Sequence, residues 1–267
     1  MTMGPLKKPP QLLLVLVTIC VLSALSSSGP VYASGKRSNS WSKYFDLSIG
    51  RTCTLAAKAK IDGVDVLSTD SQTLLSMKPK KSGSILEIRV KTVSTTPGIT
   101  PIVSQSVVPY QLLDDGALGV APDVGTMSGF NWSFTGDELY PSISALKKGV
   151  AITSRFSGVL SGATAANSAA LKNMVLSGKQ LNVSFVIRVS SAPALKEIET
   201  PSGTYRNLVG VDVKVVSANA LNAKSAAKST FSSVAKASSS VIYFAKGVGI
   251  VKGVSSGITL LLRRCAN

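Results

Sequence analysis

The 267-residue sequence contains no histidine. Histidine is the usual general base beside a serine nucleophile and the commonest metal ligand, so its absence excludes most hydrolytic and metal sites. The stretch GVSSG (253–257) matches the nucleophile-elbow pattern with Ser255 at its centre, but strand-like ITLLLRR follows it where a helix is needed. We interpret the match as chance and predict no catalytic residue and no enzyme. A serine–lysine pair is an enzymatic alternative that stays open.

Acidic residues are few, 13 against 29 lysines and arginines, and they form no metal-binding pattern. Asp62, Asp65 and Asp70 are too loosely spaced for a calcium loop, and no glutamate completes the set. The run DDG (114–116) is typical of a hairpin turn. The pair DE (137–138) is expected in an exposed loop. We therefore predict no metal and no cofactor.

Glycine-rich nucleotide motifs are missing as well. The stretch VIYFAKGVGIVKG (241–253) places glycines among β-branched and aromatic residues, but Gly253 comes one residue too late for G-x-G-x-x-G, and no G-K-[ST] follows. Both motifs also need a strand before and a helix after the glycines, whereas strand-type residues lie on both sides here. We predict a strand whose glycines mark a bulge, a tight bend or a close backbone approach.

The N-terminal residues 1–33 have the features of an export signal. A positive start (KK, 7–8) precedes the apolar run LLLVLVTICVLSALS (12–26), and VYA (31–33) is a small-x-small cleavage site. A retained membrane anchor is the alternative, although the apolar run is short for a span and no basic stop follows it. We predict a secreted or cell-envelope protein.

Cysteine is scarce, with three residues in the chain. Cys20 lies inside the signal and does not indicate lipidation, because Ile19 stands where a lipobox needs a small residue. Cys53 and Cys265 remain after cleavage, and two cysteines in an oxidising compartment pair more often than they stay free. A disulfide between them would place the first and last strands side by side. Two buried free thiols are the alternative.

The surplus of basic residues bears on the choice of partner. Removal of Lys7 and Lys8 with the signal lowers the formal charge from +16 to +14. Such a charge favours anionic partners, either phospholipid headgroups or cell-wall polymers. Nucleic acid is not expected as a partner outside the cytoplasm. A soluble, self-repelling surface with no specific partner is the alternative.

After the signal, the sequence predicts a short leader and one domain. Residues 34–43 are polar and basic and predict a disordered leader, and residues 44–267 predict a single β-rich domain. Within 84–94, apolar and charged residues alternate, as in an antiparallel sheet with one buried and one solvent-exposed face. About ten strands are predicted in all, including 52–61, 71–79, 149–162, 180–191 and 205–217, together with two strands within 103–122 that the DDG turn joins.

Two segments depart from the strand pattern. Residues 166–178 predict a helix, because Leu171 and Met174 fall on one side of it. Asn167 is its expected N-cap. Residues 218–240 are rich in alanine, serine and lysine and predict a long exposed connection, partly helical at most.

Three stretches resemble, in the same order, motifs of one group of exported bacterial proteins. YFDLSIGRTCTL (44–55) is similar to the opening Y-[FY]-P-L-x-x-G-x-x-W-x-Y, with Cys53 in place of the Trp. EIETPSGTYRNLVGVDV (197–213) is similar to E-x-V-x-V-P-A-G-T-F followed by a strand, and YFAKGVGIVK (243–252) to the closing Y-[YF]-A-K-G-V-G-L-V-K. The matched positions on which the resemblance depends are Tyr44, Phe45, Gly50, Glu197, Pro201, Gly203, Thr204, Tyr205, Lys246, Gly247, Gly249 and Lys252.

This group is the TapB-like family, with related exported domains of lipoprotein-carrier-like (LolA-like) fold. The resemblance implies a mainly β fold: a strongly curved, half-barrel-like antiparallel sheet of about ten strands with one or two short helices. It implies fold far more readily than function, since most members have no assigned reaction. We expect the matched residues to be structural, and Cys53 to replace a packing contact with a disulfide.

These observations together predict a non-enzymatic binding protein. A curved sheet leaves an apolar hollow suited to a lipid or acyl chain, and the net positive charge suits an anionic headgroup or membrane surface. The predicted headgroup contacts, each of which could equally belong to a solvated basic rim, are Lys78, Lys80, Lys81, Arg263 and Arg264. The alternative is a structural or adhesive envelope protein that binds anionic wall polymer through its basic surface, without a ligand pocket.

Overall fold

The computed structural model describes residues 41–45, 48–61, 64–80, 83–120, 124–127, 130–136, 138–237, 239–255 and 258–266. The predicted signal and most of the predicted leader lie outside these ranges. The strands in the described residues are β1 (Thr52–Ile61), β2 (Val64–Lys80), β3 (Gly83–Thr96), β4 (Ile99–Leu113), β5 (Leu118–Val120), β6 (Val124–Met127), β7 (Phe130–Thr135), β8 (Glu138–Tyr140), β9 (Ile152–Gly162), β10 (Gln180–Ser191), β11 (Glu197–Thr200), β12 (Gly203–Arg206), β13 (Leu208–Ala220), β14 (Ser240–Ala245), β15 (Gly249–Ser255) and β16 (Ile258–Ala266).

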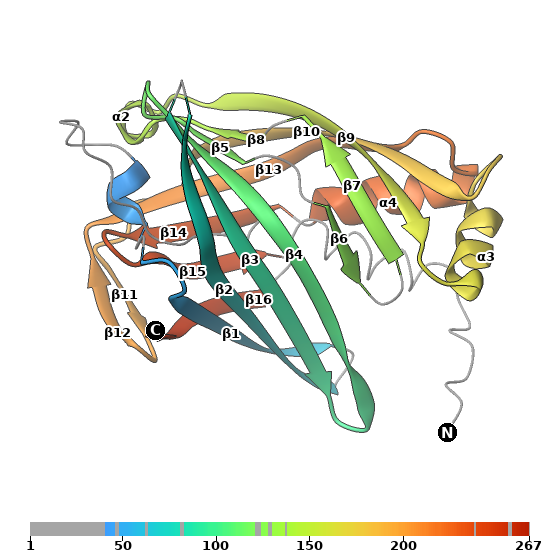
Figure 1. Ribbon diagram of the computed structural model, residues 1–267, viewed down its shortest axis with the longest axis horizontal. Coiled ribbons are helices and arrows are strands. Elements are labelled where there is room, and N and C mark those ends of the chain that lie inside the picture. Colours follow the sequence, from blue (N-terminus) through green and yellow to red (C-terminus); the bar gives the residue numbers. More distant parts are fainter. Residues whose placement is uncertain are drawn as a thin grey trace.

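Fourteen of these strands form one antiparallel sheet, and β11 and β12 form a separate hairpin. The order in the large sheet is β3-β2-β1-β16-β15-β14-β13-β10-β9-β7-β6-β4-β5-β8, and β3 also pairs with β4. The sheet is therefore strongly curved, and Figure 1 shows its strands wrapped around a common interior. The predicted fold class, a mainly β protein with a half-barrel-like curved sheet, is confirmed.

The long strands follow the predicted alternation of side chains. In β3, Leu86, Ile88 and Val90 are at most 2% exposed, whereas Arg89 and Lys91 are exposed. More strands are present than the ten or so predicted, because β5, β6, β8, β11 and β12 have only three or four residues each. Alternation cannot be recognised over so few positions.

The first and last strands of the sheet are neighbours. Cys53 on β1 lies directly opposite Cys265 on β16, and the two form a disulfide with a Cα–Cα distance of 4.0 Å. The predicted pairing is confirmed, and it links positions 212 residues apart in the sequence. Residues on either side of the bond continue the ladder, so the disulfide lies within regular sheet.

The glycine-rich stretch 241–253 covers parts of two strands, β14 and β15, and the turn between them, rather than the single strand predicted. Gly247 (φ +72°) and Gly249 (φ +98°) adopt left-handed backbone conformations that cost glycine little. The N–H of Gly247 donates to the carbonyl oxygen of Lys43 at 2.7 Å. The predicted tight bend and close backbone approach are both present, at the turn of a hairpin.

Among the described residues, three α-helices accompany the sheet: α2 (Ile143–Lys147), α3 (Ala165–Met174) and α4 (Ser225–Ala237). The predicted helix over 166–178 corresponds to α3, but its N-cap is Thr164 rather than Asn167. The Oγ1 of Thr164 accepts a hydrogen bond from the N–H of Asn167 at 3.2 Å. None of the helices among the described residues has the length and apolar character needed to cross a bilayer.

The prediction for residues 218–240, an exposed connection that is partly helical at most, did not foresee how closely part of this segment packs. Helix α4 occupies most of this segment and packs against β13, with Phe231 3% and Ala235 0% exposed. The segment looked solvated because it has one large aromatic side chain among alanines, serines and lysines. Alanine on the packed side lets the helix approach the sheet closely, so Phe231 suffices to anchor it.

The leader prediction is wrong for its last three residues. Residues Trp41–Tyr44 form a 3-10 helix, η1, and Trp41 is 1% exposed. A single large aromatic residue in a polar run contributes enough buried apolar area to order its neighbours. The domain therefore begins at or before Trp41, rather than at Tyr44.

Candidate functional site

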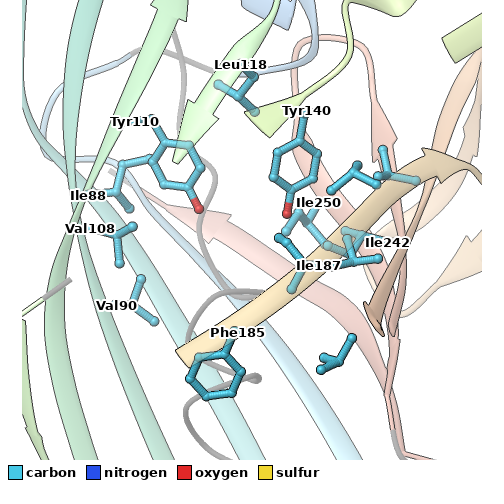
Figure 2. Close-up of a cluster of buried hydrophobic side chains, with 14 of the residues drawn as sticks. Ile88, Val90, Val108, Tyr110, Leu118, Tyr140, Phe185, Ile187, Ile242 and Ile250 are labelled. Carbon is cyan, nitrogen blue, oxygen red and sulfur yellow. The ribbon is translucent and has the colours of Figure 1, made fainter. Parts of the chain in front are cut away.

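The interior of the large sheet is the candidate site. Side chains from β3 and β4 face side chains from β10, β14 and β15 across it (Figure 2). The facing residues, each at most 4% exposed, are Ile88, Val90, Val108 and Tyr110 on one wall and Phe185, Ile187, Ile242 and Ile250 on the other. This part of the interior is entirely apolar apart from the tyrosine hydroxyl.

An aromatic cluster fills one end of the interior. The ring centroid of Trp41 lies 5.1 Å from that of Phe244, 6.1 Å from Tyr140 and 6.3 Å from Phe45. The indole N–H of Trp41 donates to the carbonyl oxygen of Pro141 at 2.9 Å. Since edge-to-face rings and a satisfied indole are a stable buried arrangement, the start of the domain occupies this end.

A second aromatic group lines the interior beneath α4. The rings of Phe156 on β9 and Phe185 on β10 are stacked with centroids 4.9 Å apart, and Phe134 on β7 lies 6.0 Å from both. Phe231 of α4 lies 5.5 Å from Phe185, so the helix covers part of the concave face. Phe185 and Phe231 are buried, but Phe134 and Phe156 are only half-buried. We call Phe134 and Phe156 the aromatic wall, because part of each side chain remains accessible to solvent.

Polar side chains line the inward face of β2, β3 and β4. Asp70, Thr92 and Ser104 are direct partners across the three strands. Gln72 and Ser106 lie in the row two residues further along β2 and β4. Four of these residues are buried, with exposures of 3% for Asp70, 2% for Gln72, 7% for Ser104 and 5% for Ser106. We call the five residues the polar strip.

The polar strip lies directly beside the apolar part of the interior. The next inward positions are Leu74 on β2 and Val108 on β4, which are 0% and 2% exposed. Along these strands the inward face therefore changes from polar to apolar within one residue pair. An interior divided in this way matches, in polarity, a molecule with one polar end and one apolar end.

Asp70 is the ionisable group of the polar strip. Burial raises its pKa to about 6, and a hydrogen bond from Thr92 opposes part of that increase. None of the ion pairs between described residues involves Asp70. A buried carboxylate without a cation beside it is a strong acceptor for N–H or O–H groups. The sequence prediction considered Asp70 only as a calcium ligand and missed this position.

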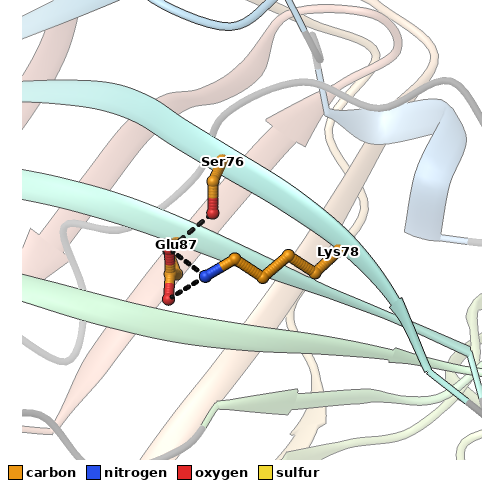
Figure 3. Close-up of polar contacts among 3 residues, drawn as sticks. All are labelled: Ser76, Lys78 and Glu87. Atoms are coloured by element: carbon orange, nitrogen blue, oxygen red, sulfur yellow. Dashed lines mark hydrogen bonds and ion pairs between the residues drawn. The ribbon is translucent and has the colours of Figure 1, made fainter.

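Lys78, the first predicted headgroup contact, lies on the outer face of the sheet. It is opposite Ile85, which alternates with the inward residue Leu86. Its Nζ lies 3.1 Å from each carboxylate oxygen of Glu87, and the hydroxyl of Ser76 donates to the same carboxylate (Figure 3). Lys78 therefore neutralises a surface carboxylate and does not face the interior.

Arg264, another predicted headgroup contact, lies far from Lys78. Arg264 lies opposite Thr54, and Thr54 lies opposite Ser71, which is seven residues before Lys78 on β2. At the rise of an extended strand this separation is about 23 Å. Lys80, Arg263 and Arg264 are exposed, and Lys81 lies outside the described residues.

The residues matched to family motifs hold separate elements together. Phe45 lies 6.0 Å from Phe244, next to the Gly247–Lys43 hydrogen bond that links η1 to the closing hairpin. Glu197 and Arg206 form an ion pair of 3.0 Å across the β11–β12 hairpin. This hairpin packs against β15 and β16. For Phe45, Glu197 and Gly247, these contacts join segments that are separate in the sequence.

The structure describes the serine of the elbow-like motif and shows no metal-binding cluster among the described residues. Ser255 is a buried residue of β15, a strand that continues a hairpin, and no helix begins there. No three acidic or cysteine side chains come together as a metal site requires within the described ranges. Asp62 and Asp137 lie outside these ranges.

Comparison with known proteins yields fold similarities. No family model matches the chain, and no curated protein matches it. A solved structure from Bacteroides fragilis, described as an exported protein with a YmcC-like fold, aligns with a TM-score of 0.45 and 10% identity. A second, described as a lipoprotein from Parabacteroides distasonis, has a TM-score of 0.49 and 13% identity. Each alignment covers 84% of this chain and 98% of the other.

Proposed function

We propose that this protein is an extracytoplasmic, non-enzymatic binding protein that holds one amphiphilic molecule, a lipid or an acyl chain, inside its curved sheet. The observation that carries the proposal is the division of the inward face into an apolar part and the polar strip. A protein whose interior served only to hold the fold together would gain stability from apolar residues at Asp70 and Gln72.

The apolar part of the ligand would lie against the aromatic wall. Phe134 and Phe156 are half-buried although they face inward, so a bound chain would remove their remaining surface from water. Each methylene buried in this way contributes about 0.8 kcal/mol. A chain of even modest length would then bind without any help from surface charge.

The polar end of the ligand would lie at the polar strip. The Asp70 carboxylate and the hydroxyls of Thr92 and Ser104 form a row of acceptors, with the hydroxyl of Ser106 two residues further along β4, and only the hydroxyls can also donate. Such a row fits a headgroup with N–H or O–H donors, such as an amine, an amide or a hydroxyl. An anionic headgroup would be repelled by Asp70, so the predicted role of the surface cations in gripping the ligand is not part of this proposal.

Location outside the cytoplasm is supported by the signal features of residues 1–33 and by the Cys53–Cys265 disulfide, which is typical of an oxidising compartment. The motif resemblance to TapB-like and LolA-like exported domains belongs to the same proposal. Its support is the three matched stretches, whose residues connect η1, the β11–β12 hairpin and the closing hairpin.

The test has two parts. The exported protein is purified without detergent, denatured and extracted, and the extract is examined by mass spectrometry for bound amphiphiles. The stripped protein is then titrated with fluorescent long-chain amines, alcohols and fatty acids. We expect saturable binding with the amine or alcohol preferred over the acid.

Two variants make the titration specific to the interior. Phe156→Gln should weaken binding of every probe by about tenfold, and Asp70→Asn should reduce the preference for the amine. Val150→Ser, at a position that is 44% exposed, is the matched control and should bind as the wild type does. An empty extract together with no saturable binding, and salt-sensitive binding to anionic wall polymer, would favour the structural envelope protein instead.

A further inference from the structure

A small exposed tip joins the end of α3 to the start of α4. It consists of residues 172–179 and 221–228, which are far apart in sequence but meet next to the start of β10. Figure 1 shows α3 and the adjacent end of α4 at one extremity of the molecule. We call these two segments the α3–α4 tip.

Backbone hydrogen bonds hold the two segments of the tip together. The N–H of Leu176 donates to the carbonyl oxygen of Asn222 at 2.7 Å, and the N–H of Lys224 donates to that of Met174 at 2.9 Å. The Asn222 side chain reinforces this junction, because its Oδ1 accepts from the N–H of Asn182 and its Nδ2 donates to Gln180, each at 2.8 Å. The two segments of the tip are therefore held to each other and to β10 by hydrogen bonds.

Two leucines point outward from this junction. Leu176 is 69% exposed and Leu221 is 57% exposed, and Leu176 is the most exposed large apolar residue in the described part of the chain. Their neighbours Val175 and Ala223 form a β-bridge and are 2% and 1% exposed. The fold thus buries the apolar residues beside the leucines while leaving the leucines themselves in solvent.

The surroundings of the two leucines are cationic. The exposed lysines of the tip are Lys172, Lys179, Lys224 and Lys228. No aspartate or glutamate occurs anywhere in residues 139–196 or 213–267. The ion pairs found between described residues include none of these lysines. The tip therefore carries positive charge that neighbouring acids do not neutralise.

We infer that the α3–α4 tip docks on the surface of an anionic lipid bilayer, with Leu176 and Leu221 inserted among the headgroups and the lysines placed against lipid phosphates. Apolar side chains ringed by cations are the composition of interfacial membrane-binding surfaces, since insertion and charge attraction act together. A protein partner would need a broader apolar patch to bury a stable interface. The inference goes beyond the proposed ligand binding and holds whether or not the interior carries a ligand.

The experiment is sedimentation of the exported protein with vesicles of phosphatidylcholine alone and of phosphatidylcholine mixed with phosphatidylglycerol. The wild type should bind the mixed vesicles, and high salt should weaken this binding. The double variant Leu176→Ser/Leu221→Ser should bind them at least about tenfold more weakly. Its control, Val103→Ser/Val150→Ser, changes two side chains that are 46% and 44% exposed elsewhere and should bind as the wild type does.

A second pair of variants distinguishes the effect of the charge at the tip from the effect of the net charge of the protein. Lys172→Gln/Lys179→Gln/Lys224→Gln should weaken binding by about a hundredfold, at roughly fivefold for each lysine. The control Lys58→Gln/Lys147→Gln/Lys148→Gln removes the same charge from other exposed positions and should change binding much less. All variants carry the same N-terminus and should unfold like the wild type.

Equal binding to neutral and mixed vesicles would overturn the inference. Unchanged binding of the double leucine variant, or equal losses in the two lysine variants, would overturn it too. Loss of vesicle binding in the tip variants with unchanged binding of fluorescent amphiphiles would support it independently of the proposed function.

Discussion

Replacement of the buried acid Asp70 by asparagine should change how stability depends on pH. Burial raises the Asp70 pKa from 3.8 to about 6, so the folded protein holds a proton more tightly there than the unfolded chain does. Between these two pH values the folded state binds more protons, and stability therefore falls as pH rises. The shift of about two pH units corresponds to a contribution of about 3 kcal/mol to the free energy of unfolding. This contribution is present in full below pH 4 and is lost by about pH 6 to 7.

Asparagine has the same shape and can still hydrogen-bond to Thr92, but it does not ionise. The Asp70→Asn variant should therefore show a flatter dependence between pH 4 and 7 and should be more stable than the wild type near pH 7, by up to about 3 kcal/mol. Urea unfolding at a series of pH values, followed by tryptophan fluorescence, measures both quantities on stripped protein.

The control is Glu199→Gln, which removes an exposed acid from the β11–β12 hairpin and should leave the pH dependence of the wild type nearly intact. Parallel pH profiles for the wild type and Asp70→Asn would refute the reasoning, because Asp70 would then titrate alike in both states. An amine ligand should have the opposite effect to burial, since a cation beside Asp70 lowers its pKa.

Three further perturbations test the fold. Cys53→Ser/Cys265→Ser should lower the free energy of unfolding by up to about 5 kcal/mol, the loop-closure entropy of so long a loop, and equal urea midpoints for reduced and oxidised wild type would contradict this. Trp41→Ala should cost about 3 to 5 kcal/mol, and a leader that did not pack would show no loss on thermal unfolding. Phe231→Ala should lower the free energy of unfolding by a similar amount and should increase proteolysis within 218–240 as α4 is released. Unchanged resistance to proteolysis would count against the anchoring role of Phe231.

The alternation of buried and exposed side chains and the cysteine pairing could be predicted from the sequence, because neither depends on knowing which strands are neighbours. Leu86, Ile88 and Val90 alternate over a strand of 14 residues, which is long enough to show period two. Cys53 and Cys265 were the two cysteines left after the signal, and only one intramolecular pair could form. The short strands and the partners of each strand depend on contacts between distant segments, which one sequence does not specify.

The candidate site was harder to predict than the fold. Asp70 and Gln72 break the usual rule that the polar residues of a strand face solvent, and only their alternation in phase with buried Leu74 shows that they point inside. Conversely, Lys78 was chosen for its charge, while the bulge between Leu74 and Ser76 and the pairing with Ile85 decide which way it points. Trp41 and Phe231 were missed because a polar local composition says nothing of one aromatic side chain that packs at long range.

The bond between Cys53 and Cys265 also has a mechanical consequence. If the chain is pulled from its two ends, the force enters at β1 and leaves at β16, and the covalent bond between these strands carries it directly. The segment η1 precedes Cys53 and would be loaded first, but nearly all of the large sheet and the α3–α4 tip lie between the two cysteines in sequence, so they bear no load while the bond is intact. A pull on the two ends would thus leave the sheet between the cysteines undistorted, and reduction of the disulfide would remove that protection.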